Sequence, residues 1–256
     1  MENFILVPTD FSDNAWVALQ YAANLAADTK MQLKIIHVCN QAENVASDQM
    51  SALISQFNDQ FPSLNFNGSY LKGSLNESIN QLLRDESYKL IVMGTKGASR
   101  LKSVFLGSNT MNIINQSSIP VIAIPENANY ILNKIGLLSN YKNIEIDVMK
   151  KAIDVLPDSF TLTLLHVRED ENEDEEVILD AWKEVMKDKT NLKKVECRIG
   201  IGSGVNSIVN TMIKEEKIDL LIATNNGKSF FRTLFNRNLI KTIAMRPQAP
   251  VLFIKA

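Results

Sequence analysis

The sequence has little of what several protein classes require. Its two cysteines, Cys39 and Cys197, lie far apart and outside any CxxC pair, which argues against a disulfide framework or a thiolate zinc site. The formal net charge is only -2, so no overall basic field attracts nucleic acid or an anionic membrane surface. Long apolar runs are missing, and the first residues, MENFILVPTDF, lack the positive charge of a signal peptide. We therefore expect a cytoplasmic protein that binds neither nucleic acid nor membrane.

What the sequence does contain is an internal repeat. Residues 90–125 align with residues 220–255 at a constant offset of 130, with glycine, serine, phenylalanine and proline positions retained. The same offset, or one of 129, aligns the strand-like segments that precede them. Two copies of one domain follow from this repeat. We expect one domain over residues 1–127 and a second over residues 131–256.

The first copy alternates short apolar runs with segments of helical periodicity. Apolar runs bounded by proline, glycine or polar residues are typical of buried strands, and apolar residues at helical spacing predict helices. The expected strands cover residues 3–8, 32–38, 65–73, 89–94 and 120–125, and the expected helices cover residues 12–29, 43–61, 76–87 and 108–117. This alternation predicts an α/β fold, a doubly wound parallel sheet with helices on both faces.

A ligand of such a sheet binds at the carboxyl ends of the strands, near the point where the winding reverses. Three loops are expected there: residues 8–10 after the first strand, the turn after Val38, and the stretch GTKGASRLKSVFLGSNT after Met93. The glycine stretch leaves its strand at Gly94 and enters a helix near Ser108. Helix N-termini expose unpaired amides, and glycines let such amides approach an anion closely. This stretch is therefore a candidate phosphate-binding loop.

The glycine spacing separates this loop from the common nucleotide motifs. GxxxxGK[ST] is absent, and no GxGxxG follows the first strand. The spacing Gly-x2-Gly-x9-Gly-Ser, built from Gly94, Gly97, Gly107 and Ser108, resembles the ATP-binding signature of the universal stress protein family. The resemblance covers nearly the whole chain, as two tandem domains. It implies two Rossmann-like domains of the adenine nucleotide alpha hydrolase-like type, each an open five-stranded parallel sheet, which pair through their last strands as an intramolecular pseudo-dimer.

The resemblance also implies a function, that of an ATP-binding regulatory protein of the stress response. Asp10 would meet the adenine or ribose, Val38 would line the adenine pocket, and Lys96 would contact phosphate where the family often has His or Arg. The cofactor implied is ATP, with or without Mg²⁺, and no catalytic or metal-ligating residue is assigned. The expected cofactor-binding residues are Pro8, Thr9, Asp10, Val38, Met93, Gly94, Lys96, Gly97, Gly107, Ser108 and Asn109.

The second copy departs from the signature at most of the positions expected to contact the nucleotide. Only Gly227 keeps its glycine, while the other equivalents are Asn140 for Asp10, Thr224 for Gly94, Arg237 for Gly107 and Asn238 for Ser108. Larger side chains at close-approach positions should block the family's binding mode. We therefore predict one nucleotide per chain, bound by the first copy.

Structural interpretations stand beside these functional ones. Glycines in loops often serve turn geometry only, and Asp10 could be no more than a helix cap. His37 and His166 occupy equivalent strand ends, which favours a packing role over a metal site. The acidic stretch at residues 168–176 is expected to be a solvated loop.

Catalysis has little support in the sequence. Phosphoryl transfer needs metal-holding carboxylates, and Asp10 is the one obvious carboxylate near the glycine loop. Ser108 has no histidine partner that the sequence places beside it, so a nucleophile and base pair is unsupported. Nucleotide binding without efficient turnover is favoured. A weak ATPase, and a non-nucleotide binding or interaction module that uses the second domain, stay open, as do a homodimer and the identity of a protein partner.

Overall fold

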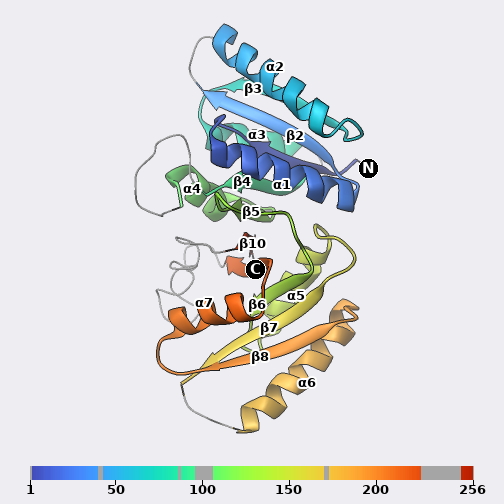
Figure 1. Ribbon diagram of the computed structural model, residues 1–256, viewed down its shortest axis with the longest axis vertical. Coiled ribbons are helices and arrows are strands. Elements are labelled where there is room, and N and C mark those ends of the chain that lie inside the picture. Colours follow the sequence, from blue (N-terminus) through green and yellow to red (C-terminus); the bar gives the residue numbers. More distant parts are fainter. Residues whose placement is uncertain are drawn as a thin grey trace. The chain divides into compact units, whose positions relative to one another are not determined.

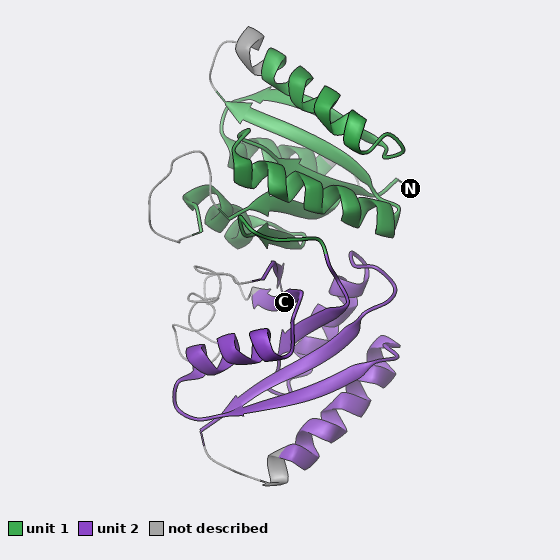
Figure 2. Cartoon of the chain, in the orientation of Figure 1, with its two compact units in different colours: residues 1–130 green, residues 131–256 purple. Residues whose placement is uncertain are grey.

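The chain divides into two compact units, residues 1–130 and residues 131–256 (Figure 2). The computed structural model describes residues 2–39, 43–85, 88–95, 106–169, 173–225 and 249–255. Each unit contains five parallel strands and an apolar core. Among the described residues, every helix is too short or too polar to span a membrane.

The N-terminal unit alternates strands and helices in the predicted order (Figure 1). Its elements are β1 (Phe4–Pro8), α1 (Asp13–Thr29), β2 (Gln32–Cys39), α2 (Glu43–Gln60), β3 (Phe66–Lys72), α3 (Leu75–Asp85), β4 (Tyr88–Gly94), α4 (Ser108–Gln116) and β5 (Val121–Ile124). The strands pair in parallel in the order β3-β2-β1-β4-β5. The chain thus winds outward from β1 in one direction and then returns to continue from β4 in the other.

Helices cover both faces of this sheet, with α1 in front of it and α3 behind it in Figure 1. Right-handed crossovers require this division, because the winding reverses between β1 and β4. Strands β1 and β4 are consequently buried and apolar, as in the fully buried triplet Leu90, Ile91 and Val92. The predicted α/β fold is confirmed.

Helix α1 begins and ends at residues suited to those positions. The Ser12 hydroxyl caps the helix by accepting the Ala15 N–H at 3.3 Å. At the other end Lys30 adopts a left-handed conformation with φ of 57°, and its N–H donates to the Ala26 carbonyl. Small and apolar residues recur along the buried face, which lets the helix lie close to β1, β4 and β5.

The C-terminal unit repeats this architecture. Its elements are β6 (Lys134–Leu138), α5 (Ile144–Ile153), β7 (Thr161–Arg168), α6 (Glu173–Thr190), β8 (Val195–Ile201), α7 (Val205–Glu215), β9 (Leu220–Asn225) and β10 (Val251–Lys255). Its strands pair in parallel in the order β10-β9-β6-β7-β8. The order is that of the first unit with β6 in the place of β1.

One sequence expectation is wrong in this unit. The acidic stretch at residues 168–176 is not all loop, because Arg168 ends β7 and α6 already begins at Glu173. An argument from repulsion between like charges predicts a loop here, and it does not predict that a helix begins at Glu173.

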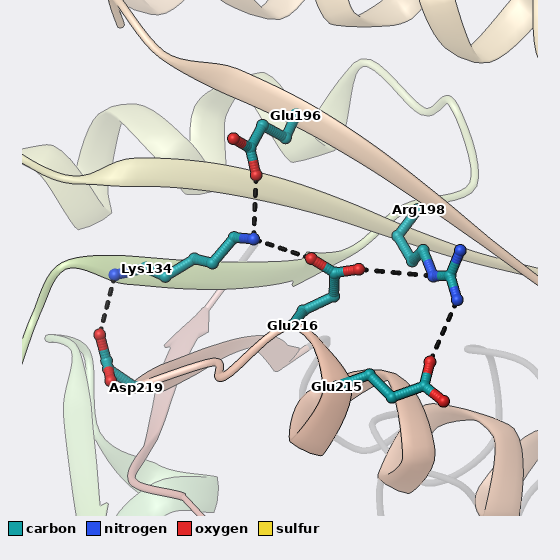
Figure 3. A network of polar contacts seen from close by, with 6 residues as sticks. All are labelled: Lys134, Glu196, Arg198, Glu215, Glu216 and Asp219. Carbon is teal, nitrogen blue, oxygen red and sulfur yellow. Dashed lines mark hydrogen bonds and ion pairs between the residues drawn. The ribbon is translucent and has the colours of Figure 1, made fainter.

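A polar network joins β6, β8 and α7 in the C-terminal unit. Its central residue, Lys134, aligns with Phe4 of the N-terminal unit, whose ring instead contacts the Tyr88 ring. Figure 3 shows the members of the network, Lys134, Glu196, Arg198, Glu215, Glu216 and Asp219. The Lys134 ammonium donates to Glu216 at 2.7 Å and lies 3.0 Å from Glu196. These contacts, the hydrogen bond to Glu216 first, raise the pKa of Lys134 although partial burial opposes the shift.

We expect Lys134→Met to lower the free energy of unfolding of the C-terminal unit by about 1 kcal/mol at low salt, and by less in 1 M NaCl, because salt screens ion pairs. Since the folded-state pKa of Lys134 is raised, its stabilising effect is complete below pH 10.5 and is lost as the pH rises through the folded-state pKa. The sequence has two tryptophans, Trp16 and Trp182, so a Trp16→Phe background makes fluorescence report on the C-terminal unit alone. Equal salt dependence of the variant and its parent would contradict the expectation.

Candidate functional site

One cavity of about 150 Å³ lies where the carboxyl ends of β1, β2 and β4 meet the start of α4. It is lined by residues from the loop after β1, the end of β2 and both sides of the glycine stretch. Nine of the residues predicted from the sequence lie in this lining: Pro8, Thr9, Asp10, Val38, Met93, Gly94, Gly107, Ser108 and Asn109. The predicted residues Lys96 and Gly97 lie outside the described residues.

Three further residues line the cavity and were missed by the sequence reasoning. Ala15 comes from the first turn of α1, Leu75 from the first residue of α3, and Thr110 from the first turn of α4. They belong to the starts of the helices that follow the strand ends. The prediction considered only the loops and therefore did not include these three residues, although they lie at or near the predicted helix starts.

The loop after β1 is a tight turn built around Asp10. Its carboxylate Oδ1 accepts the Ser12 N–H at 3.1 Å and the Ser12 hydroxyl at 2.5 Å. Phe11, in the middle of the turn, has a positive φ of 62°, and its N–H donates to the Thr9 hydroxyl at 3.1 Å. Ser12, and not Asp10, is the N-cap of α1. Asp10 is exposed, so it organises the turn while presenting its carboxylate at the mouth of the cavity.

His37 supports this turn from β2. Its Nδ1 lies 2.8 Å from the Thr9 carbonyl oxygen, which can only accept, so Nδ1 carries the proton in this contact. The imidazole also packs against the Phe11 ring, with 4.4 Å between centroids. In the second unit, His166 contacts the Ser139 carbonyl at 2.9 Å and the Tyr141 ring at 4.7 Å. The equivalent geometry in both units indicates a packing role for these histidines.

The start of α4 forms the opposite wall of the cavity. Gly107 is the N-cap and provides no side chain to bond the first amides of the helix. The first turn carries no acidic residue, and Ser108 and Asn109 are exposed. A helix start of this kind keeps its partial positive charge and its outward-facing amides available to an anion. Within the described residues, Asp10 is the one charged side chain in the lining.

Gly94 has a reason to be glycine that the sequence did not reveal. A Cβ at this position would lie 2.8 Å from Asn14 Oδ1 and 2.9 Å from Asn14 Cγ. Asn14, in the first turn of α1, is only 4% exposed and occupies the space beside the Gly94 backbone. Helix α1 therefore makes a close approach to the backbone at Gly94.

The second unit fills the corresponding region with a carboxylate of its own. Glu145 in the first turn of α5 aligns with Ala15 of the cavity lining, and it is 4% exposed. Its Oε2 accepts the Ser139 hydroxyl at 2.6 Å and the Trp182 indole N–H at 3.1 Å. Its Oε1 accepts the Asn140 N–H at 2.7 Å. A buried carboxylate with this many donors is well satisfied.

The two units differ in which carboxylate accepts the hydrogen bonds of this turn. In the first unit Asp10 accepts from the N–H of Ser12. In the second unit Asn140 replaces that aspartate, and Glu145 accepts from the N–H of Lys142 at 3.3 Å. The acceptor of the turn is thus exposed at the cavity in one unit and buried inside the other. The second unit has kept the turn and removed the exposed charge.

Comparison with known proteins finds a family model that is similar to the first unit. The model of the universal stress protein family matches residues 3–60 and 69–125. Universal stress protein MJ0577 of Methanocaldococcus jannaschii is 27% identical over 150 residues, covering 47% of this chain and 93% of that protein.

Solved structures are similar to nearly the whole chain or to about half of it. A universal stress protein from Archaeoglobus fulgidus has 18% identity and a TM-score of 0.71, covering 98% of this chain and 96% of its own, which shows a shared fold. Another universal stress protein, solved in complex with cAMP, has 22% identity and a TM-score of 0.40, covering 48% of this chain and 96% of its own.

We expect Glu145→Ala to destabilise the C-terminal unit by about 3 kcal/mol, because the change leaves several buried donors without their acceptor. Chemical denaturation in the Trp16→Phe background, followed by Trp182 fluorescence, measures the change. Glu184→Ala is the matched control, since Glu184 is an exposed helix residue paired only with Lys187 in the described contacts, and it should cost less than about 0.5 kcal/mol. Equal effects of the two variants would contradict the role of Glu145.

Proposed function

We propose that the chain belongs, through its N-terminal unit, to the universal stress protein family, and that this unit binds ATP as a regulatory ligand without efficient turnover. The observation that carries the proposal is the convergence of three loops on one cavity at the point where the sheet winding reverses. The wall of this cavity formed by α4 begins with a glycine that leaves the helix amides uncapped.

The chemistry of the lining fits the parts of an adenine nucleotide. Val38, Met93 and Leu75 supply apolar contacts that suit the adenine ring. The exposed Asp10 carboxylate suits ribose hydroxyls, which donate hydrogen bonds to it. The amides after Gly107 and the Ser108 hydroxyl suit the phosphates. The resemblance of the glycine spacing to the family's ATP-binding signature selects ATP among adenine nucleotides.

The same lining favours binding over catalysis. Phosphoryl transfer uses metal-bound phosphates and a residue that orients the nucleophile. Asp10 is the one carboxylate that the described residues contribute to this cavity. No cluster of three or more His, Cys, Asp or Glu side chains suited to a metal ion occurs among them. A regulatory nucleotide site, with slow hydrolysis as the runner-up, is the function that these groups support.

We propose a single nucleotide site per chain. The second unit has Thr224, Arg237 and Asn238 at the positions of Gly94, Gly107 and Ser108 of the signature. It also buries the carboxylate of its first turn in Glu145. Pairing of the units through their last strands stays a prediction from the family resemblance.

The direct test is to denature freshly purified protein and analyse the supernatant for adenine nucleotide, followed by titration of the nucleotide-free protein with ATP. We expect one ATP per chain. Gly107→Arg, which copies the second unit, should weaken ATP binding by at least about 100-fold, because a guanidinium stem fills the space at the start of α4.

Gln116→Arg is the matched control, because it adds the same charge at the exposed C-terminal residue of the same helix. Its affinity for ATP should equal that of the parent. Retained affinity in Gly107→Arg, or two ATP molecules per chain, would overturn the proposed site.

A time course of ADP formation separates binding from turnover. We expect product to accumulate more slowly than about one equivalent per minute, since the described residues bring no metal-binding cluster to the cavity. Faster turnover that Gly107→Arg abolishes would establish the ATPase function instead. Turnover that persists unchanged in Gly107→Arg would come from another site or a contaminant.

A further inference from the structure

Asn14 is a buried polar residue that the proposed ATP site does not itself use. It lies in the first turn of α1, is 4% exposed, and is absent from the cavity lining. Its Nδ2 donates to the Ile124 carbonyl at the end of β5, at 3.1 Å. Its Oδ1 accepts the Thr95 hydroxyl just after β4, at 3.4 Å. One amide therefore joins the ends of two neighbouring strands to helix α1.

The residues that Asn14 contacts also hold the far side of the glycine stretch. Thr95 donates its N–H to the Ile124 carbonyl at 2.9 Å and accepts the Gly107 N–H at 2.7 Å. The Thr110 hydroxyl donates to the Gly94 carbonyl at 2.9 Å. The beginning and the end of the stretch are thus bonded directly to each other, next to Asn14.

The second unit has lost this cluster together with the glycine signature. The equivalents at the offset of 130 are Ile144 for Asn14, Thr224 for Gly94, Asn225 for Thr95, Arg237 for Gly107 and Ile240 for Thr110. Ile144 is 38% exposed, so it does not fill the place of a buried amide. The polar cluster occurs together with Gly94 and Gly107 in one copy, and all of these residues are replaced in the other.

We infer that Asn14 is a positioning residue for the phosphate-binding loop. It fixes Gly94 and Thr95, and through the Thr95 carbonyl it fixes Gly107, so that the first amides of α4 face the cavity. Gly94 is glycine because Asn14 occupies the space of its Cβ. The effect on ATP rests on the proposed function. The contacts of Asn14 with Thr95 and Ile124, which we call the clamp, do not depend on a nucleotide.

The clamp is tested without ligand by amide hydrogen exchange of the nucleotide-free protein. In Asn14→Ala, exchange at the Thr95 and Gly107 amides should become at least about tenfold faster than in the parent. The Thr9 amide, which donates to the Ile36 carbonyl at 2.8 Å, is the internal control and should change little. Uniform acceleration at all three amides would reduce Asn14 to a general stabiliser and overturn the inference.

The effect on the ligand is tested by a double-mutant cycle. Asn14→Ala and Gly94→Ala should each weaken ATP binding about tenfold, while adenosine, which lacks phosphates, should bind both variants as it binds the parent. The double variant should lose clearly less than the product of the two single losses, because removal of the amide relieves the contacts of the new Cβ at 2.8 Å and 2.9 Å, while the Asn14 carbonyl oxygen stays 3.1 Å away.

The outcomes of the two experiments separate the inference from the proposed function. Additive losses in the double variant, or equal losses for adenosine, would show that Gly94 faces the ligand or that Asn14 acts only on stability, and would overturn the inference. A parent protein that binds no ATP, but whose Thr95 and Gly107 amides still respond selectively to Asn14→Ala, would refute the function and leave the clamp standing.

Discussion

The candidate site depends on the close packing of the first turn of α1 against the ends of β4 and β5. This packing is possible because one residue at the contact has no side chain and the residue that faces it carries a buried amide. Gly94 has no side chain, and Asn14 fills the vacant space and bonds to the Ile124 carbonyl. Through Thr95 the contact continues to Gly107 at the start of α4. The geometry of the cavity is set by helix packing before any ligand is present.

The two units show how one fold can either present or bury a charged turn. Both keep the positive-φ aromatic residue after the first strand, and both support it with a histidine. They differ in which residue accepts the hydrogen bonds of the turn. An exposed aspartate does so in the first unit and a buried glutamate in the second. The second unit has therefore kept the turn conformation and an acceptor for its hydrogen bonds, but it lacks the exposed carboxylate that would face a ligand.

Much of this organisation could be predicted from the sequence. The repeat, the strand and helix order and the parallel sheet follow from periodicity, because short apolar runs between amphipathic helices have few alternative arrangements. The glycine spacing and the rule for strand ends also brought Asp10, Val38 and Ser108 to one place. The start of α6 at Glu173 was not predicted, since the acidic stretch was interpreted only as a solvated loop of repelling charges.

The sequence by itself determined the fold and the loops that line the cavity, because hydrophobic periodicity and glycine placement are local properties of the chain. Only the tertiary structure decided why Gly94 is bare, what Asn14 holds, and that Glu145 takes over from Asp10. These facts concern residues that lie far apart in the sequence or on different elements. Their contacts depend on the directions of side chains in three dimensions, which no periodicity records.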